Sequence, residues 1–240
     1  MRYTMSMVTA ALLSAVVLQG CGGDNKVAPI NTNPASVPLG AIVSGSNSFR
    51  VLAGSTVANT GNTTVAGDVG VWAGASVTGF GPGTMTGNGG VAHSADVAAQ
   101  LAQSDLTIAY NNAAGRAAGA AVAGNIGGQT LTPGVYTSAS SLEISSGNLT
   151  LNGNSAGVFI FQIPSTLTVT AGRQVILTGG AQASNVYWQV GSSATLGTTA
   201  NFSGIILANS SITLATGATL HGRALARVGG VALDSNIVGP

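Results

Sequence analysis

Threonine and asparagine recur in pairs three residues apart along this chain, which has few charged side chains for other chemistry. The pairs are Thr60 and Thr63 in "TGNT", Thr198 and Asn201 in "TTAN", and Thr216 and Thr219 in "TGAT". A threonine carries a hydroxyl that donates and accepts hydrogen bonds, a methyl group, and a stiff χ1 torsion. Such residues, repeated once per structural unit, predict a surface that contacts a regular lattice.

Residues that could perform acid–base, nucleophilic or metal chemistry are few and separated in the sequence. The six acidic residues are Asp24, Asp68, Asp96, Asp105, Glu143 and Asp234. Hydrolases need two catalytic groups close together, and we expect no such pair on neighbouring units. His93 and His221 lack metal-ligand spacing, and no GxSxG elbow occurs. We therefore expect no enzyme, no cofactor, no metal site and no small-molecule substrate.

Two further features favour structural roles over binding roles. The loop "GFGPGTMTGNGG" (79–90) is rich in glycine, but it lacks the Gly-Lys-Ser/Thr ending of a phosphate loop. Trp188 lies in the apolar run "VYWQV", so we expect it in the core rather than stacked on a sugar. The chain has seven basic and six acidic residues, and without residues 1–20 it has six of each and is formally neutral. A neutral chain has no electrostatic footprint for nucleic acid, and we expect none as a partner.

The first forty residues read as a processing and tethering segment. Residues 1–20 combine one arginine with the apolar run "VTAALLSAVVL", which is typical of a signal peptide. "LQGC" resembles a bacterial lipobox, which implies cleavage before Cys21 and its lipidation; ordinary secretory cleavage is the alternative. Residues 21–40 carry three prolines and predict a flexible tether. We expect an exported protein, either secreted or anchored to the outer membrane.

Short alternating runs occupy residues 41–240, which we expect to form one domain. "TLTVT" (166–170) and "SITLA" (211–215) place apolar residues on one face and hydroxyl or small residues on the other, as strands do. The segments "TVAGDVGV", "NFSGIILA" and "TLHGRALA" align on Gly67, Gly204 and Gly222. A period of about 18 residues with glycine corners is typical of solenoids. We predict a mainly β fold, a three-sided parallel β-solenoid.

One segment, about 94–115, departs from this pattern and predicts an α-helix. Ser94 is the expected N-cap and Gly115 the expected stop. The apolar residues at helical spacing are Val97, Leu101, Ala102, Ile108 and Ala109, and we expect them to pack along one side of the solenoid. A helix that binds a partner protein is the alternative.

Five segments together resemble the ice-binding (antifreeze) β-solenoid family of cold-adapted microbes. They are "FRVLAGSTVANTGNTTVAGDVGV", "LTPGVY", "GVFIFQI", "NVYWQVGSSATLG" and "GRALA". The resemblance covers about residues 40–238. It implies a right-handed, discontinuous solenoid with a long helix packed along one face, and a protein that binds ice crystal planes and has no catalytic activity. The resemblance also implies that a Thr-(Ala/Gly)-x-(Thr/Asn) motif, which some members carry, borders the binding face.

The predicted ice-binding residues combine outward threonines of the strands with the motif pairs. They are Thr60, Thr63, Thr168, Thr170, Thr195, Thr198, Asn201, Thr213, Thr216 and Thr219. Two alternatives stay open at this point. Threonine is also a favoured outward residue of any strand. A surface adhesin or structural lipoprotein that binds polysaccharide could use the same face. We expect a monomer.

Overall fold

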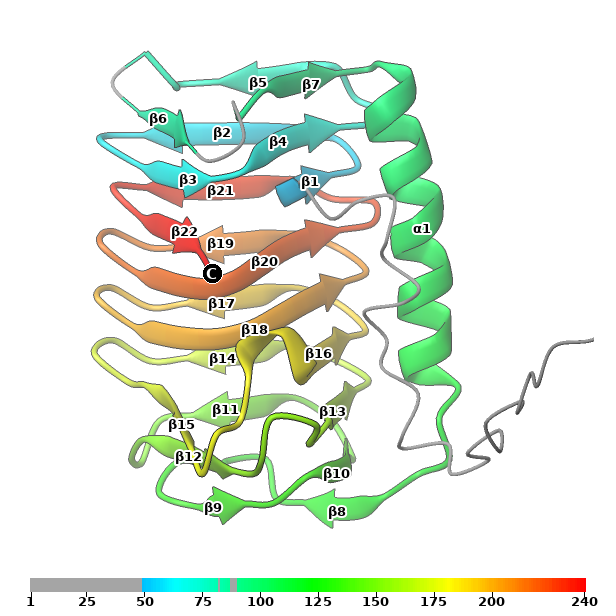
Figure 1. The fold of residues 1–240 in the computed structure, drawn as a ribbon, viewed down its shortest axis with the longest axis vertical. Coiled ribbons are helices and arrows are strands. Elements are labelled where there is room, and N and C mark those ends of the chain that lie inside the picture. Colours follow the sequence, from blue (N-terminus) through cyan, green and yellow to red (C-terminus); the bar gives the residue numbers. More distant parts are fainter. Residues whose placement is uncertain (1–48, 82, 87–89) are drawn as a thin grey trace, which may run out of the picture. The chain divides into compact units, whose positions relative to one another are not determined.

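The computed structural model describes residues 49–81, 83–86 and 90–240. These residues form a mainly β domain with one α-helix, and its strands pair in parallel (Figure 1). Four sequence predictions fall outside the described residues. They are the signal peptide (1–20), the lipidation site Cys21, the tether (21–40) and the start of the domain at residue 41.

One side of the domain is a sheet of seven short strands, which we call the seven-stranded sheet. In Figure 1 it lies behind the strands nearest the viewer. Its strands, in spatial order, are β11 (Leu142–Ile144), β14 (Leu167–Val169), β17 (Ala194–Leu196), β19 (Ile212–Leu214), β21 (Val231–Asp234), β2 (Thr56–Thr60) and β5 (Ser76–Thr78). Inward residues such as Leu167 and Val169 are buried while their neighbours face outward, so the predicted alternation is confirmed.

Two further sheets form the other two sides. The twelve-stranded sheet contains β6 (Thr84–Thr86), β3 (Thr64–Ala66), β22 (Ile237–Gly239), β20 (Thr219–Ala226), β18 (Asn201–Ala208), β16 (Val186–Val190), β13 (Phe159–Ile163), β10 (Gly134–Ser138), β8 (Ala120–Val122), β1 (Phe49–Ala53), β4 (Asp68–Val71) and β7 (Ala92–Ser94). The three-stranded sheet contains β15 (Val175–Thr178), β12 (Leu149–Asn152) and β9 (Thr130–Leu131). A short 3-10 helix, η3 (Ala183–Asn185), precedes β16.

Glycines make the corner at which the twelve-stranded sheet turns from one side to the next. Gly67, Gly204 and Gly222 have φ of +151°, +124° and +154°, a backbone region that disfavours residues with a Cβ. A Cβ on Gly222 would lie only 1.9 Å from the carbonyl oxygen of Gly204. Strands β18 and β20 pair in register through these two glycines. The predicted glycine repeat is therefore confirmed as a stacked corner.

This corner divides the twelve-stranded sheet between two sides. What we call the third side consists of the segments of β18 and β20 before the glycines, the strands β22, β3 and β6, and the three-stranded sheet. The helix side consists of the segments of β18 and β20 after the glycines and the strands β1, β4, β7, β16, β13, β10 and β8. With the seven-stranded sheet these make three sides, as the sequence predicts.

The coils do not stack in chain order. The chain forms β1 to β7 at one end, passes through the helix, and then builds the coils from β8 back toward the first ones (Figure 1). The last coil docks against the first: β21 pairs with β2, β22 with β3, and β20 with β1. This contact pairs sheet edges that would otherwise expose unpaired backbone groups. The predicted discontinuous solenoid is confirmed.

The predicted helix is α1 (Val97–Ala114), which lies along the helix side. Its N-cap is Asp96, whose side chain accepts a hydrogen bond from the Ala99 backbone, so the expected cap at Ser94 is wrong. Ser94 instead belongs to β7 and donates to the carbonyl of Ala75. Gly115 ends the helix, as predicted.

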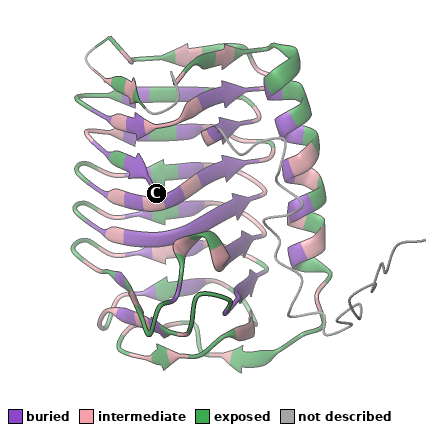
Figure 2. Cartoon of the chain, viewed as in Figure 1, coloured by how far each residue is buried: buried purple, intermediate pink, exposed green. Residues whose placement is uncertain are grey.

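The buried stripe of α1 is rotated relative to the predicted one. Ala99, Ala102, Leu106, Ala109 and Ala113 are buried, and Figure 2 shows the buried positions of α1 alternating with exposed ones. The predicted contacts of Val97, Leu101 and Ile108 are wrong, because these side chains are 69%, 60% and 53% exposed. Small alanines pack against the sheet since they allow a close approach of helix and strands. Leu106 is the one large apolar side chain of the buried stripe.

The interior is filled by apolar side chains from all three sides. Aromatic rings of successive coils stack within it: Tyr136 on Phe161, Phe161 on Trp188, and Trp188 beside Phe202. Trp188 is fully buried, which confirms its predicted place in the core. A rigid interior of this kind holds the outward residues of the strands in fixed positions.

Candidate functional site

The outer surface of the seven-stranded sheet carries regular rows of small hydroxyl side chains, which we call the hydroxyl face. Register pairs Glu143, Thr168, Thr195, Thr213, Ala232, Ala58 and Thr78 across the sheet, so they form its central row. Neighbouring strands lie about 4.8 Å apart, which sets the spacing along the row. Thr195 and Thr213 are exposed and Thr168 is half-buried. Three predicted residues therefore lie side by side.

A second row runs beside the first, two residues earlier on each strand. It consists of Ser141, Thr166, Ser193, Ser211, Gly230, Thr56 and Ser76. Two hydroxyls of this row are hydrogen-bonded to each other, since Thr166 donates to Ser141 over 2.9 Å. The sequence prediction left this row out of the site. Its signal was a serine or threonine directly before the first core residue of most strands.

The rows are interrupted where the last coil meets the first. At this junction, small residues replace the hydroxyl residues of the other strands; they are Gly230, Ala232 and Ala58. A hollow opens there between Thr213 on one side and Thr56 on the other. Ile212 and Val231 line the hollow together with small residues. The hydroxyl face therefore consists of two patches, one on β14, β17 and β19 and one on β2 and β5.

At the far edge of this face, Thr170 and Thr60 turn their hydroxyls toward the protein. The Thr170 hydroxyl donates to the Ile144 carbonyl and the Thr60 hydroxyl to the Leu233 carbonyl, each over 3.3 Å. Thr198 and Thr216 lie in the following loops and are exposed. These four predicted residues border the hydroxyl face rather than extend its rows.

One predicted residue, Thr63, cannot contact any surface lattice because it is fully buried. Its hydroxyl accepts a hydrogen bond from the Asn236 backbone over 3.1 Å. The cause is a shift by one residue: Thr64, not Thr63, shares a row with Thr219 through Ile237. A shift of one residue turns a strand side chain to the opposite face.

Asn201 and Thr219 begin β18 and β20, and both lie around the corner on the third side. They are register partners, and the row continues through Ile237 and Thr64 to Thr84. The structure therefore does not bring these two predicted residues onto the hydroxyl face. Both are half-buried.

A carboxylate occupies the corner next to the hydroxyl face. Asp234 accepts hydrogen bonds from the hydroxyls of Thr216 and Ser235. The Thr216 bond has the largest effect and lowers the pKa of Asp234; burial acts in the opposite direction, and the nearby Ser235 and Thr60 hydroxyls lower the pKa further. Asp234 is therefore ionised at neutral pH, and it engages the Thr216 hydroxyl that the sequence assigned to lattice binding.

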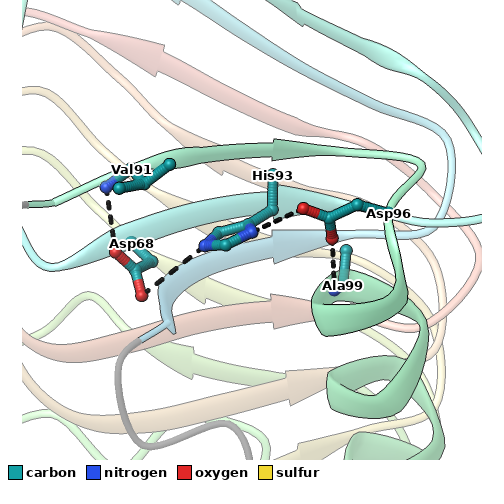
Figure 3. A network of polar contacts seen from close by, with 5 residues as sticks. All are labelled: Asp68, Val91, His93, Asp96 and Ala99. Atoms are coloured by element: carbon teal, nitrogen blue, oxygen red, sulfur yellow. Dashed lines mark hydrogen bonds and ion pairs between the residues drawn. The ribbon is translucent and has the colours of Figure 1, made fainter.

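The sequence predicts no pair of acidic residues on neighbouring units, but Asp68 on β4 and Asp96 after β7 both lie beside His93 (Figure 3). His93 Nδ1 lies 2.7 Å from an Asp96 oxygen, and Nε2 lies 3.8 Å from an Asp68 oxygen. The other oxygens accept backbone hydrogen bonds, Asp68 from Val91 and Asp96 from Ala99. The Ala99 bond, followed by the His93 bond, lowers the pKa of Asp96.

This network joins β4, β7 and the start of α1, so its geometry is that of a structural clasp. Each carboxylate already holds a backbone amide. Among the described residues, no group of three or more His, Cys, Asp or Glu side chains could hold a metal ion. Within the described ranges, no helix is long and apolar enough to cross a membrane.

The fold and the face define the class of protein: a discontinuous β-solenoid that presents rows of small hydroxyl residues on one sheet. Residues 51–239 match the family described as Ice-binding-like. An ice-binding protein of Nostoc sp. (strain HG1) is 46% identical over 196 residues, which are 80% of this chain and 71% of that protein. An ice-binding protein of a Colwellia species is 37% identical over 220 residues, 85% of this chain and 84% of that protein.

Solved structures agree with these relatives. The crystal structure of an ice-binding protein from an Antarctic biological consortium superposes with a TM-score of 0.80 and 46% identity, covering 94% of this chain and 96% of that one. An ice-binding protein of the Antarctic ascomycete Antarctomyces psychrotrophicus gives a TM-score of 0.76 and 39% identity, covering 82% and 96%. This chain belongs to the ice-binding protein family.

Proposed function

We propose that this protein adsorbs to ice through the hydroxyl face and thereby inhibits ice growth and recrystallisation. The single observation that carries the proposal is the register of Thr168, Thr195 and Thr213 on three successive strands. Membership of the ice-binding family supports it. The face has no aromatic side chain in its two rows, which favours ice over a polysaccharide ligand.

The physical argument starts from the spacing of the two rows. Neighbouring strands lie about 4.8 Å apart, and residues two apart on one strand lie about 6.7 Å apart, so the hydroxyls and methyls form a grid. The stiff χ1 of threonine limits the entropy lost when the grid orders water. Each contact is weak, but many rigid contacts made at once slow release. Charged groups would orient water differently, and Glu143 at one end is the one charge of the central row.

The proposed contact residues follow from their places on the sheet. The centre of the site is Thr168, Thr195 and Thr213 with Thr166, Ser193 and Ser211 beside them. Thr56, Ser76 and Thr78 form the second patch, and Thr60, Thr170, Thr198 and Thr216 form the border. Buried Thr63 has no part in the site, and Asn201 and Thr219 lie outside its plane.

Ice-crystal shaping and recrystallisation assays on the purified protein test this proposal. Thr195→Tyr and Thr213→Tyr place a bulky ring in the middle of the grid, and each is expected to abolish crystal shaping. Thr130→Tyr on β9 is the matched control, because Thr130 is an exposed strand threonine on the third side. Shaping that survives in both face variants, with the fold intact, would place the site elsewhere.

Three finer features are part of the same proposal. We infer that the protein acts by adsorption alone, without catalysis, and as a monomer, which size-exclusion chromatography with light scattering tests. We infer further that it is exported and that Cys21 carries a lipid anchoring it to the outer membrane. Metabolic labelling with a fatty acid analogue tests the anchor: label should enter the native protein and be absent from Cys21→Ala. An unlabelled native protein would favour a secreted form.

A further inference from the structure

A pocket opens on the helix side beside the C-terminal end of α1, where α1 lies next to β13 and β16 (Figure 1). Its volume is about 370 Å³, within the range of about 300–1,000 Å³ that is usual for sites of small molecules. Tyr110 and Ala114 of α1 form one wall, and residues in or directly after β10, β13 and β16 form the other. No residue of the seven-stranded sheet lines it, so the pocket is separate from the hydroxyl face.

The strand wall of this pocket is one row of polar side chains. Register pairs Thr137 of β10 with Gln162 of β13, and Gln162 with Gln189 of β16. On the next strand the row continues with Leu207, which is buried in the same apolar cluster as Leu106 of α1. The pocket therefore begins where the outward row of the helix side changes from apolar to polar residues.

Gln162 fixes the position of α1 beside this row. Its Nε2 donates to the carbonyls of Ala113 and Arg116 over 3.0 and 2.9 Å, at the end of the helix. Its Oε1 accepts a hydrogen bond from the Thr137 hydroxyl over 2.9 Å. Both ends of the Gln162 amide are therefore engaged by the protein, and the two walls of the pocket are held together.

Gln189, the next residue of the row, has a buried amide without such partners. The residue is only 6% exposed and lines the pocket, yet its side chain makes no hydrogen bond to any residue that the structure describes. Buried polar groups are nearly always hydrogen-bonded, because an unpaired one loses its water without compensation. The partner of the Gln189 amide must therefore be a molecule that enters the pocket.

Tyr110 gives the pocket an aromatic wall that is held in place from outside. The guanidinium carbon of Arg227 lies 4.5 Å from the centre of the Tyr110 ring, and Arg227 also donates to the Asn209 side chain over 3.1 Å. The Tyr110 hydroxyl makes no hydrogen bond within the described part of the chain. A tyrosine of this kind offers an apolar ring and a polar tip to the same ligand.

We propose that this pocket binds one neutral sugar ring, hydrogen-bonded to the Gln189 amide and packed against Tyr110. No acidic, basic or histidine residue is among those that line the pocket, so the wall has no charge that would select an ion. Each sugar hydroxyl both donates and accepts, as the amide and the phenol require. Ala114 and Pro164 supply apolar contacts for the C–H groups of the ring.

The size of the pocket sets the size of the ligand. A volume of about 370 Å³ equals roughly twelve water molecules at about 30 Å³ each, which admits one sugar ring with some of its water. The ring can come from a free monosaccharide or from one residue of a polysaccharide. This inference does not depend on the proposed function, because a sugar bound here leaves the hydroxyl face uncovered.

Saturation-transfer NMR and calorimetric titration of the purified protein test the proposal. The probes are methyl α-glucopyranoside, methyl α-mannopyranoside and methyl β-galactopyranoside. At least one is expected to bind with a Kd of roughly 1–10 mM, since a small open pocket covers only part of a sugar. Gln189→Leu and Tyr110→Phe should each weaken binding about three- to tenfold, the usual effect of losing one neutral hydrogen bond.

Thermal unfolding separates a binding role of Gln189 from a structural one. Gln189→Leu should keep or raise the Tm of the free protein, because leucine removes an unpaired polar group from a buried position. The bound glycoside should raise the Tm of the parent more than that of the variant, because only a bound ligand stabilises the native state. Gln100→Leu, at an exposed position of α1, is the matched control and should bind like the parent.

Maltohexaose, titrated in parallel with methyl α-glucopyranoside, distinguishes the two sources of the sugar. An affinity gain beyond the statistical factor for its repeated rings indicates a residue within a polysaccharide, and no such gain indicates a single sugar.

Two results would overturn the inference. One is the absence of binding for all three glycosides, which would leave water as the partner of Gln189. The other is binding in folded Gln189→Leu and Tyr110→Phe that equals binding in the parent. Crystal shaping by both variants should match the parent, so failure of this inference is separable from failure of the ice-binding proposal.

Discussion

Filling the gap in the hydroxyl face should improve the adsorption of this protein to ice. The central row runs Thr168, Thr195, Thr213, Ala232, Ala58 and Thr78, so two alanines separate the two hydroxyl patches. The double variant Ala58→Thr/Ala232→Thr makes six consecutive threonines. Both alanines are exposed above a hollow, so the added atoms meet solvent and not packed side chains.

The size of the expected gain follows from the groups that are added. Each substitution adds one methyl and one hydroxyl, which together contribute about 0.5–1 kcal/mol to a rigid contact. Two sites give about 1–2 kcal/mol, equivalent to roughly a 5- to 30-fold change in an equilibrium constant. Threonine is also favoured over alanine in strands, so stability should not fall.

The assay is the protein concentration that halves the rate of ice recrystallisation, measured together with thermal hysteresis. We expect that concentration to fall at least about fivefold in the double variant. The control is Ala120→Thr/Ala121→Thr on β8, which adds the same atoms at exposed positions of the helix side. An unchanged or weaker activity of the folded double variant would refute the reasoning that a continuous row governs adsorption.

The remaining predictions concern the scaffold and its pH dependence. Gly222→Ala should lower the free energy of unfolding by about 4 kcal/mol or more, because the added Cβ meets a backbone carbonyl. Gly172 has φ of +69° but open space around it, so Gly172→Ala should lower the same free energy by only about 1–2 kcal/mol. Chemical denaturation measures both. Leu106→Ala should cost about 2–5 kcal/mol and Leu101→Ala close to nothing, because only Leu106 is buried beneath α1; equal losses would contradict the observed helix rotation. Hydroxyl hydrogen bonds lower the pKa of Asp234 below its ordinary value of about 3.9, so the stability it contributes is present above that pH and is lost as the pH falls through the lowered pKa. The Tm difference between the parent and Asp234→Asn should accordingly narrow in acid, and a constant difference would count against this interpretation.

The sequence determined by itself the features that depend on local pattern. Alternation in "TLTVT" and "SITLA" predicted which residues face inward, since side chains of a strand point to opposite faces in turn. The aligned glycines predicted a corner because only glycine adopts their backbone angles readily. The 18-residue spacing placed Thr195 and Thr213 in one row, and the structure pairs them.

Only the tertiary structure decided how coils distant in the sequence meet. The junction of β2 with β21 sets Ala58 beside Ala232 and interrupts the hydroxyl face. No local pattern encodes a register between two residues that lie 174 positions apart. The same junction packs the buried Thr63 hydroxyl against the Asn236 backbone of the last coil. These features depend on long-range contacts, whose register is chosen by the packing of whole coils and not by the propensities of neighbouring residues.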